Sequence, residues 1–531
     1  MAEIQATPAK PDPLLNATVM SDEELKVHVT VASLPGEVLG QTFALLSQHE
    51  RACTSLVCKR WAEIGRTSRA LWAAGVRLEL SLGLPGAVER SEVFVRWLVI
   101  RAPHLQSLSI IARRSPDAQN PHAANSAAAN GGHSGPVSQI EAVCGANVAA
   151  ALAVAGPHLR ELSVEWDGQL VLSGWPATMT SVRIASFSAE ELTVRPGLGS
   201  LPCLRDLRLK SVTTPLSLNG PSSSLLPAHL KALRMDGCHL RQLPPSVANL
   251  CHLTDLVLSN NALTQADLEP LSRMTTLQQL TLMGTRMSHL PPALSALTNL
   301  RVLYLDGVAG GGGAGGANDP GANGAAIGGG LFNEFETDRQ ICDALGPLRN
   351  LGILSLGSSR LGQFPSDLAE LSSLRVLYLD NNPSLATLPD GIYLRRLHVL
   401  GLDWRVLFAS HAVLRGAPLL RKLCLTSLGG VEEVPAEERD EDAIAETLLT
   451  HPKLCQVLLP MVDGNRLPLF IPALNVALRL AASPRIDVQA VTYGGISNEW
   501  IEFLVDLELK ENGQKGSEKV QVENSKATAA E

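Results

Sequence analysis

A phrase of the form Leu-x-x-Leu-x-Leu recurs along most of this chain, and its spacing restricts the fold more than any other feature. Copies begin at Leu204, Leu230 (closed by Met235), Leu253, Leu277, Leu300, Leu351, Leu374, Leu397 and Leu420. From Leu230 onward the intervals are 23, 24, 23, 51, 23, 23 and 23 residues. The long interval is one repeat with about 28 additional residues, nearly all of them in a glycine-rich run. One such unit cannot bury its own apolar side chains, so neighbouring units must stack.

The period and the residue that follows each phrase resemble the leucine-rich repeats. A polar residue or cysteine stands at the ninth position of several copies, as Cys238, Asn261, Thr285 and Asn382. The resemblance implies an α/β solenoid in which each phrase is a short strand of a curved parallel sheet, in the shape of a horseshoe. The ninth residue is expected to tie down the backbone as the chain leaves the strand. Weaker copies at Leu105, Leu159 and Leu454 extend the array in both directions.

Composition agrees with an aliphatic core and disfavours a nucleic-acid surface. Apolar residues make up 45% of the 531 residues, but aromatic residues only 4%. The formal net charge is −8, whereas a nucleic-acid surface needs a concentrated basic face. We therefore predict no nucleic-acid partner.

The cysteines and the apolar runs predict the compartment. The nine cysteines are scattered without a regular framework, which suits reduced thiols. The first twenty residues lack the pattern of a signal peptide, and no apolar run approaches the roughly 20 residues of a membrane span. The prediction is a protein without a membrane partner in the cytoplasm, the nucleus or both. The cytoskeleton or a ciliary axoneme is the alternative location.

Shifts in composition divide the chain into segments. A disordered N-terminus (1–30) precedes a helical module (31–75), and a linking helix with the first repeat follows (76–110). A low-complexity insertion (111–138) then leads into the solenoid (139–490), which carries the glycine-rich insertion at 307–330. A C-terminal cap (491–508) and a disordered tail (509–531) complete the prediction.

The helical module resembles the F-box family over about 40 residues, from 33 to 72. The resemblance rests on Leu34-Pro35-x-Glu37-Val38-Leu39, on Phe43, on the run Val57-Cys58-Lys59-Arg60-Trp61, and on Leu71-Trp72. It implies a three-helix module that docks on the Skp-type adaptor of a cullin ubiquitin ligase. The residues implied to bind the adaptor are Leu34, Pro35, Val38, Leu39, Phe43, Val57, Cys58 and Trp61. The alternative is a helical cap of the solenoid that binds no adaptor.

Catalytic and metal-binding patterns are missing from the sequence. Cys53 and Cys58 have no matching pair at metal-ligand spacing, and the histidines His398, His411 and His451 are isolated. The glycine run at 310–316 lacks the Lys-Ser/Thr of a phosphate-binding loop. We predict no metal, no cofactor and no enzymatic activity.

The fifth and seventh residues of each phrase are expected to point away from the core, onto the concave side of the sheet. Early repeats place basic residues there, Arg208 and Arg234 among them, and later repeats place tyrosines and carboxylates. The candidate substrate-binding residues are Tyr304, Asp306, Tyr378, Asp380, Asp403 and the adjacent Trp404. Both tyrosine rings are expected to face solvent. The alternative is that tyrosine at this position only packs on the sheet.

Together the two resemblances predict the substrate-recruiting subunit of a Skp–cullin–F-box ubiquitin ligase. The module would hold the adaptor, and the solenoid would hold an unidentified protein substrate. The alternative is a leucine-rich-repeat scaffold, for example in cytoskeletal or axonemal assembly, with a vestigial F-box. Co-purification with the adaptor discriminates between them.

Overall fold

The computed structural model describes residues 39, 76–82, 87–101, 105–114, 136–154, 158–167, 170–172, 175–186, 192–194, 198–212, 226–285, 287, 289–307, 338–427, 439–460 and 475–491. The chain divides into two compact units, Met1–Val257 and Leu258–Glu531.

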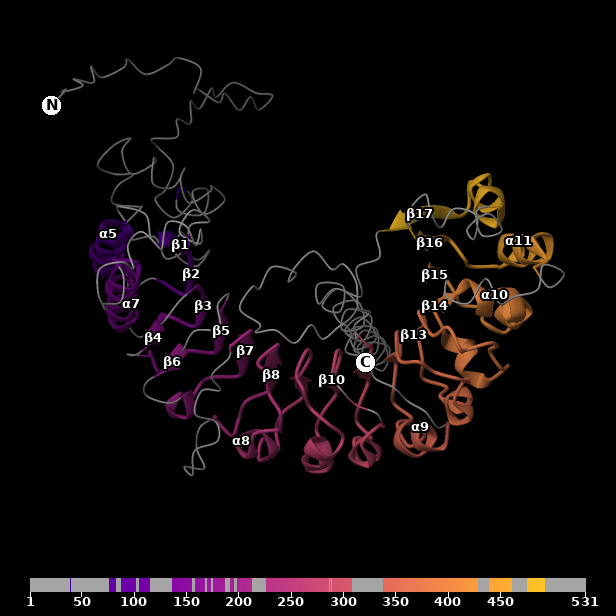
Figure 1. Ribbon diagram of the computed structural model, residues 1–531, viewed down its shortest axis with the longest axis horizontal. Coiled ribbons are helices and arrows are strands. Elements are labelled where there is room, and N and C mark those ends of the chain that lie inside the picture. The colour runs from indigo at the N-terminus through magenta and orange to yellow at the C-terminus, as the bar shows by residue number, and fades with distance from the viewer. Residues whose placement is uncertain are drawn as a thin grey trace, which may run out of the picture. The chain divides into compact units, whose positions relative to one another are not determined.

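The first unit is built on a parallel sheet whose strands follow one another in chain order (Figure 1). Its strands are β1 (Val76–Leu82), β2 (Ser107–Arg114), β3 (Glu161–Trp166), β5 (Ser181–Ser186), β7 (Asp206–Lys210), β8 (Ala232–Asp236) and β9 (Asp255–Val257). Two helices, α5 (Ala87–Arg101) and α7 (Pro136–Val154), pack against each other beside β1. Short strands β4 (Leu170–Leu172) and β6 (Leu192–Val194) pair in a separate parallel sheet. The 3-10 turn η6 (Leu198–Ser200) and helix α8 (Pro245–Ala248) lie between later strands.

The second unit repeats the same arrangement. They are β10 (Gln279–Thr281), β11 (Val302–Tyr304), β12 (Ile353–Ser355), β13 (Val376–Tyr378), β14 (Val399–Asp403), β15 (Lys422–Ser427), β16 (Gln456–Pro460) and β17 (Asp487–Val491). The helices are α9 (Asp338–Leu345), α10 (Trp404–Ser410) and α11 (Glu441–Thr450). The 3-10 turns are η7 (Ala266–Arg273), η8 (Pro292–Ala296), η9 (Ser366–Glu370), η10 (Ile392–Arg396) and η11 (His411–Gly416). Parallel strands need crossovers, and these segments lie in the crossovers between successive strands.

The leucines of each phrase form the core on one side of the sheet. Leu300, Leu303 and Leu305 are all 0% exposed. Because successive side chains of a strand point to opposite faces, the intervening residues lie on the other side, which we call the strand face. The described helices lie on the leucine side (Figure 1). This confirms the predicted fold, an α/β leucine-rich-repeat solenoid.

A left-handed residue ends the strand segment of each of several repeats. The eighth residue of the phrase has a positive φ of 52–61° at Ser211, Gly237, Asn260, Gly284, Ser358 and Asn381. Glycine and asparagine adopt this conformation at little cost, which explains why they recur here. The chain turns at this residue and places the ninth residue under the strand.

The predicted role of the ninth residue is confirmed. The amide of Asn261 donates to Leu258 O (2.8 Å), and the Thr285 hydroxyl donates to Leu282 O (2.9 Å). Asn382 donates to Leu356 O and Leu379 O (2.9 and 2.8 Å). The ninth residues therefore replace backbone partners that the curved sheet cannot provide.

Several elements differ from the predicted segments. β1 is a strand, although only a helix was expected before Leu105, and β5 and β17 carry no Leu-x-x-Leu-x-Leu phrase. β2 extends to Arg114 and α7 begins at Pro136, so both ends of segment 111–138 belong to regular elements. The glycine-rich insertion from 308 onward, the predicted cap beyond Val491 and the tail lie outside the described residues. None of the described helices is both long and apolar enough to span a membrane.

Candidate partner-binding faces

In the second unit, the parallel register lines up equivalent strand-face residues in two rows. The first row runs through Val302, Ile353, Val376, Val399, Lys422 and Gln456. The second row runs through Tyr304, Ser355, Tyr378, Gly401, Cys424 and Leu458. Stacking at equal register therefore converts a sequence repeat into a continuous surface.

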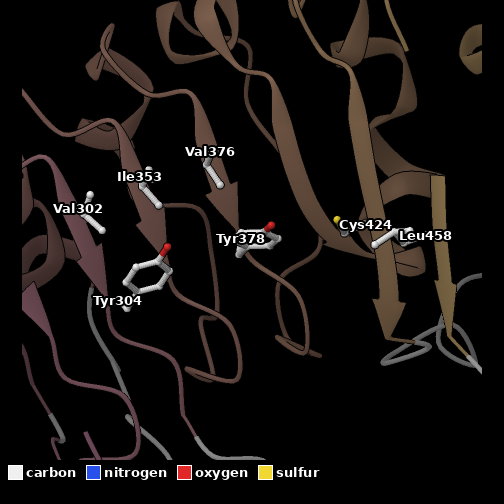
Figure 2. Packing of buried hydrophobic residues seen from close by; sticks show 7 residues of the cluster. All are labelled: Val302, Tyr304, Ile353, Val376, Tyr378, Cys424 and Leu458. Carbon is white, nitrogen blue, oxygen red and sulfur yellow. The ribbon is translucent and has the colours of Figure 1, made fainter. Parts of the chain in front are cut away.

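An apolar patch covers much of these rows. It consists of Val302, Tyr304, Ile353, Val376, Tyr378, Cys424 and Leu458, which Figure 2 shows along one face of the strands. Their exposed fractions lie between 0% and 7%. Gly401 leaves room for the neighbouring ring, because a Cβ there would lie 2.4 Å from Tyr378 Cδ1. The Tyr378 ring thus occupies the space that a side chain at position 401 would fill.

The register predicted for Tyr304 and Tyr378 is found, but the prediction that both rings face solvent is wrong. Tyr304 is 0% exposed and Tyr378 is 6% exposed. Burial raises the pKa of the Tyr378 hydroxyl well above its ordinary value. Both tyrosines therefore belong to a buried apolar cluster rather than to a solvent-exposed strip.

The apolar residues of the first row were missed as candidates. The third position of each phrase lies two residues before the fifth, on the same face of the strand. In four phrases it is occupied by Val302, Ile353, Val376 and Val399. The signal was present in the sequence, since four consecutive repeats carry a branched apolar residue at that position.

Asp306 and Asp403 bind loops of the repeats rather than pointing outward. Asp306 Oδ1 accepts hydrogen bonds from Ser355 Oγ and from the Gly357 amide (3.0 Å). The two oxygens of Asp403 accept from the amides of Asn381 and Asn382 (2.6 and 2.8 Å). Asp306 is 7% exposed and Asp403 is 0% exposed, while Asp380 is half-buried. Each of the two buried carboxylates thus organises a loop of the adjacent repeat.

Trp404 does not share the surface of the tyrosines. It begins α10, is 0% exposed and packs against Phe408 with ring centroids 6.0 Å apart. The prediction of one continuous strip that includes Trp404 is wrong, because the helix turns this side chain into the core.

The environment of Asp306 predicts a pH-dependent stability. Burial raises its pKa from 3.8 to about 7, and Asp380 adds to the rise, whereas the hydrogen bond from Ser355 opposes it. The folded state therefore keeps a proton that the unfolded chain has lost. The resulting stabilisation is complete below pH 3.8 and disappears as pH rises through about 7.

An Asp306→Asn variant should remove this dependence, because the amide oxygen can still accept the two hydrogen bonds and carries no charge. At pH 8 we expect it to be more stable than the parent by up to about 4 kcal/mol, at roughly 1.4 kcal/mol per pKa unit. Urea unfolding between pH 4 and pH 8 measures the difference. Parallel pH profiles of the two proteins would contradict the assignment.

The strand face of the first unit carries a row of arginines. Arg183, Arg208 and Arg234 stand at the same register on β5, β7 and β8. Arg183 is exposed and the other two are half-buried. Arg208 Nε lies 3.0 Å from Asp206 Oδ2. Arg183 was missed because β5 lacks the leucine phrase, and only strand pairing places it in this row.

The described part of the N-terminal module is Leu39, which is helical and 1% exposed. The other residues implied to bind the adaptor, Leu34, Pro35, Val38, Phe43, Val57, Cys58 and Trp61, lie outside the described residues. Comparison with known families supplies the decisive observation: residues 31–74 match the F-box-like family model. The chain is an F-box/leucine-rich-repeat protein.

Curated relatives of this F-box/leucine-rich-repeat protein match only part of it. Disease resistance protein RPS4B of Arabidopsis thaliana is 36% identical over 115 residues, 21% of this chain and 10% of that protein. Volume-regulated anion channel subunit LRRC8E of Xenopus tropicalis is 23% identical over 249 residues, 46% of this chain and 25% of that protein. The chain thus spans a quarter or less of the length of these relatives.

Solved structures that resemble the chain share little sequence with it. An internalin of Listeria monocytogenes has a TM-score of 0.41 and 15% identity, covering 64% of this chain and 82% of its own. A leucine-rich-repeat protein of Leptospira interrogans has a TM-score of 0.44 and 16% identity, covering 81% of this chain and 92% of its own.

The F-box/leucine-rich-repeat protein shows no metal-binding constellation in its described part. No group of three or more His, Cys, Asp or Glu side chains among those residues could hold a metal ion. The described cysteines are free thiols, namely Cys144, Cys203, Cys238, Cys251, Cys342, Cys424 and Cys455. F-box and leucine-rich-repeat families are typically interaction modules. The F-box-like match and the repeat fold therefore favour protein binding.

Proposed function

We propose that the chain recruits a protein partner to a Skp–cullin–F-box ubiquitin ligase. The observation that carries the proposal is the F-box-like match at residues 31–74, followed in the same chain by a repeat-built sheet. The F-box-like segment would bind the Skp-type adaptor, and a strand face would bind the partner. The chain would contribute proximity, because it holds a partner lysine near a ubiquitin-charged enzyme.

The strand face of the first unit supports the proposal, because it aligns charged side chains that a partner could bind. The aligned arginines of the first unit, Arg183, Arg208 and Arg234, suit carboxylate or phosphate groups, which guanidinium binds in a bidentate manner. A cytoplasmic or nuclear location forms part of the proposal.

Replacing Leu34 and Pro35 together with alanine should abolish co-purification with the Skp-type adaptor. The resemblance places both residues in the docking ridge, and neither belongs to the repeat core, so the solenoid should keep its circular dichroism spectrum. A Gln48→Ala variant of the same segment, outside the ridge, serves as the matched control. If the parent and the double variant co-purify equal amounts of adaptor, the proposal is refuted. A leucine-rich-repeat scaffold is then the better interpretation.

A further inference from the structure

The turns that lead into the strands of the second unit collect positive charge. We call the four residues before each of β10–β17 its leading turn, which gives 275–278, 298–301, 349–352, 372–375, 395–398, 418–421, 452–455 and 483–486. The cations in the leading turns of β11 and β13–β16 are Arg301, Arg375, Arg395, Arg396, Arg421 and Lys453. All eight turns lie in the described part of the chain, and none contains Asp or Glu. One edge of the sheet is therefore basic in a chain whose formal net charge is −8.

Most of these cations are accessible to a ligand. Five of the six side chains are exposed, and Arg375 is half-buried. None of the five exposed cations forms an ion pair with another described residue. Two further cations of the leading turns donate to carbonyls, Arg349 to Glu370 O (3.3 Å) and Arg485 to Leu449 O. The basic edge thus carries charge that the described part of the chain does not neutralise.

Backbone hydrogen bonds place these cations at regular intervals. The second residue of each leucine phrase ends a leading turn, and these residues are joined from repeat to repeat. The amide of Gly352 donates to Arg301 O (2.8 Å), and the amide of Arg375 donates to Gly352 O (2.8 Å). The amide of Arg421 donates to His398 O (2.9 Å). Arg301, Arg375 and Arg421 therefore stand on alternate strands, with backbones roughly 10 Å apart.

The carboxylates of the same repeats lie at the other end of the strands. Asp306 and Asp380 follow β11 and β13, and Asp403 ends β14. An extended stretch from Arg301 to Asp306 is roughly 16 Å long, about two Debye lengths at physiological salt. Two exposed carboxylates border the leading turns, Glu370 before the turn of β13 and Asp487 at the start of β17. The basic edge is thus electrostatically distinct from the acidic ends of the strands.

Carboxylates of an extended peptide fit this edge better than a nucleic acid does. Guanidinium groups bind carboxylates in a bidentate manner. Binding of single-stranded nucleic acid relies on stacking against aromatic side chains, and the leading turns contain no Phe, Trp or Tyr. The edge from β11 to β16 is roughly 24 Å long, which about seven residues of extended peptide would span.

We propose that the leading turns of β11–β16 bind an Asp/Glu-rich segment of a partner protein, which crosses the strands in an extended conformation. This edge differs from the strand face invoked for the proposed function, and the inference does not depend on the ligase role. Because salt screens exposed ion pairs, the complex is tightest at low ionic strength and weakens as the salt concentration rises.

Fluorescence anisotropy of the purified full chain with a labelled octaglutamate peptide tests the proposal. The triple variant Arg301→Gln, Arg395→Gln, Arg421→Gln should weaken binding about tenfold at low salt, because each exposed pair contributes modestly. The matched control, Arg360→Gln, Arg405→Gln, Arg479→Gln, removes the same charge from the second unit outside the leading turns. It should leave the affinity nearly unchanged, and octaglutamine should not bind the parent.

A third variant separates charge from structure. Replacing Arg301, Arg395 and Arg421 with lysine keeps the charge and should retain most of the affinity, and circular dichroism melting checks that each variant is folded. If the lysine variant loses as much affinity as the glutamine variant, the three residues do not act through their charge and the proposal fails.

Three other outcomes would also overturn the proposal. They are no binding of octaglutamate by the parent, equal losses in the two glutamine variants, and tighter binding of another anion. The anions to compare are a single-stranded oligonucleotide and vesicles that contain phosphatidylserine; tighter binding of either, with the same dependence on the three arginines, would assign the edge to another ligand class. None of these measurements uses adaptor or ubiquitin, so failure here is distinct from failure of the proposed ligase role.

Discussion

Replacing Asn382 with alanine should lower the free energy of unfolding by about 3–5 kcal/mol. Its amide nitrogen donates to Leu356 O and Leu379 O (2.9 and 2.8 Å). Its oxygen accepts from the amides of Ser359 and Leu361 (3.1 and 3.0 Å). Asn382 is 0% exposed, so water cannot replace the lost partner and the backbone groups stay buried without hydrogen bonds.

Urea unfolding and amide hydrogen exchange measure this effect together. Exchange at Ser359 and Leu361 should accelerate first, because these amides lose their acceptor directly. Asn299→Ala is the matched control: Asn299 is exposed and its amide donates a hydrogen bond to Thr275 O (2.9 Å), so the loss of stability should be small. If Asn382→Ala lowers the free energy of unfolding no more than Asn299→Ala does, the ninth residue does not stabilise the fold.

Replacing Trp404 with alanine should destabilise the second unit by about 3–5 kcal/mol, the usual cost of truncating a buried tryptophan. The side chain is 0% exposed and packs against Phe408, so its removal leaves a cavity in the core. Trp404→Phe should cost much less. The indole Nε1 has no hydrogen-bond partner among the described residues, and phenylalanine keeps most of the apolar contact.

The half-buried Trp175 provides the control for this substitution. Trp175→Ala removes the same side chain from a site that already contacts water, and it should cost less than Trp404→Ala. Thermal or urea denaturation of the three variants gives the comparison. If Trp404→Ala leaves stability unchanged and abolishes partner binding instead, Trp404 is a binding residue as originally predicted from the sequence.

The repeat architecture could be predicted from the sequence because its cause is local and periodic. Leucines at positions one, four and six of a short strand place an apolar row on one face, and the 23-residue spacing aligns the next row beside it. The ninth residue was predicted correctly for the same reason: Asn261 and Asn382 bind carbonyls within three residues of themselves. The motif at 33–72 likewise predicted the F-box-like match.

Only the tertiary structure decided how far the strand-face residues are buried and how they combine. Alternation along a strand assigns Tyr304 and Tyr378 to the face away from the leucines, but it carries no information about their burial, and both rings are buried. The same limit applies to Asp403 and Trp404, whose partners lie in a neighbouring repeat and in α10. Arg183 joins Arg208 and Arg234 only through strand pairing, because β5 lacks the leucine phrase. The periodic spacing in the chain determined each repeat's inward face, whereas contacts between segments distant in sequence determined the properties of the outward one.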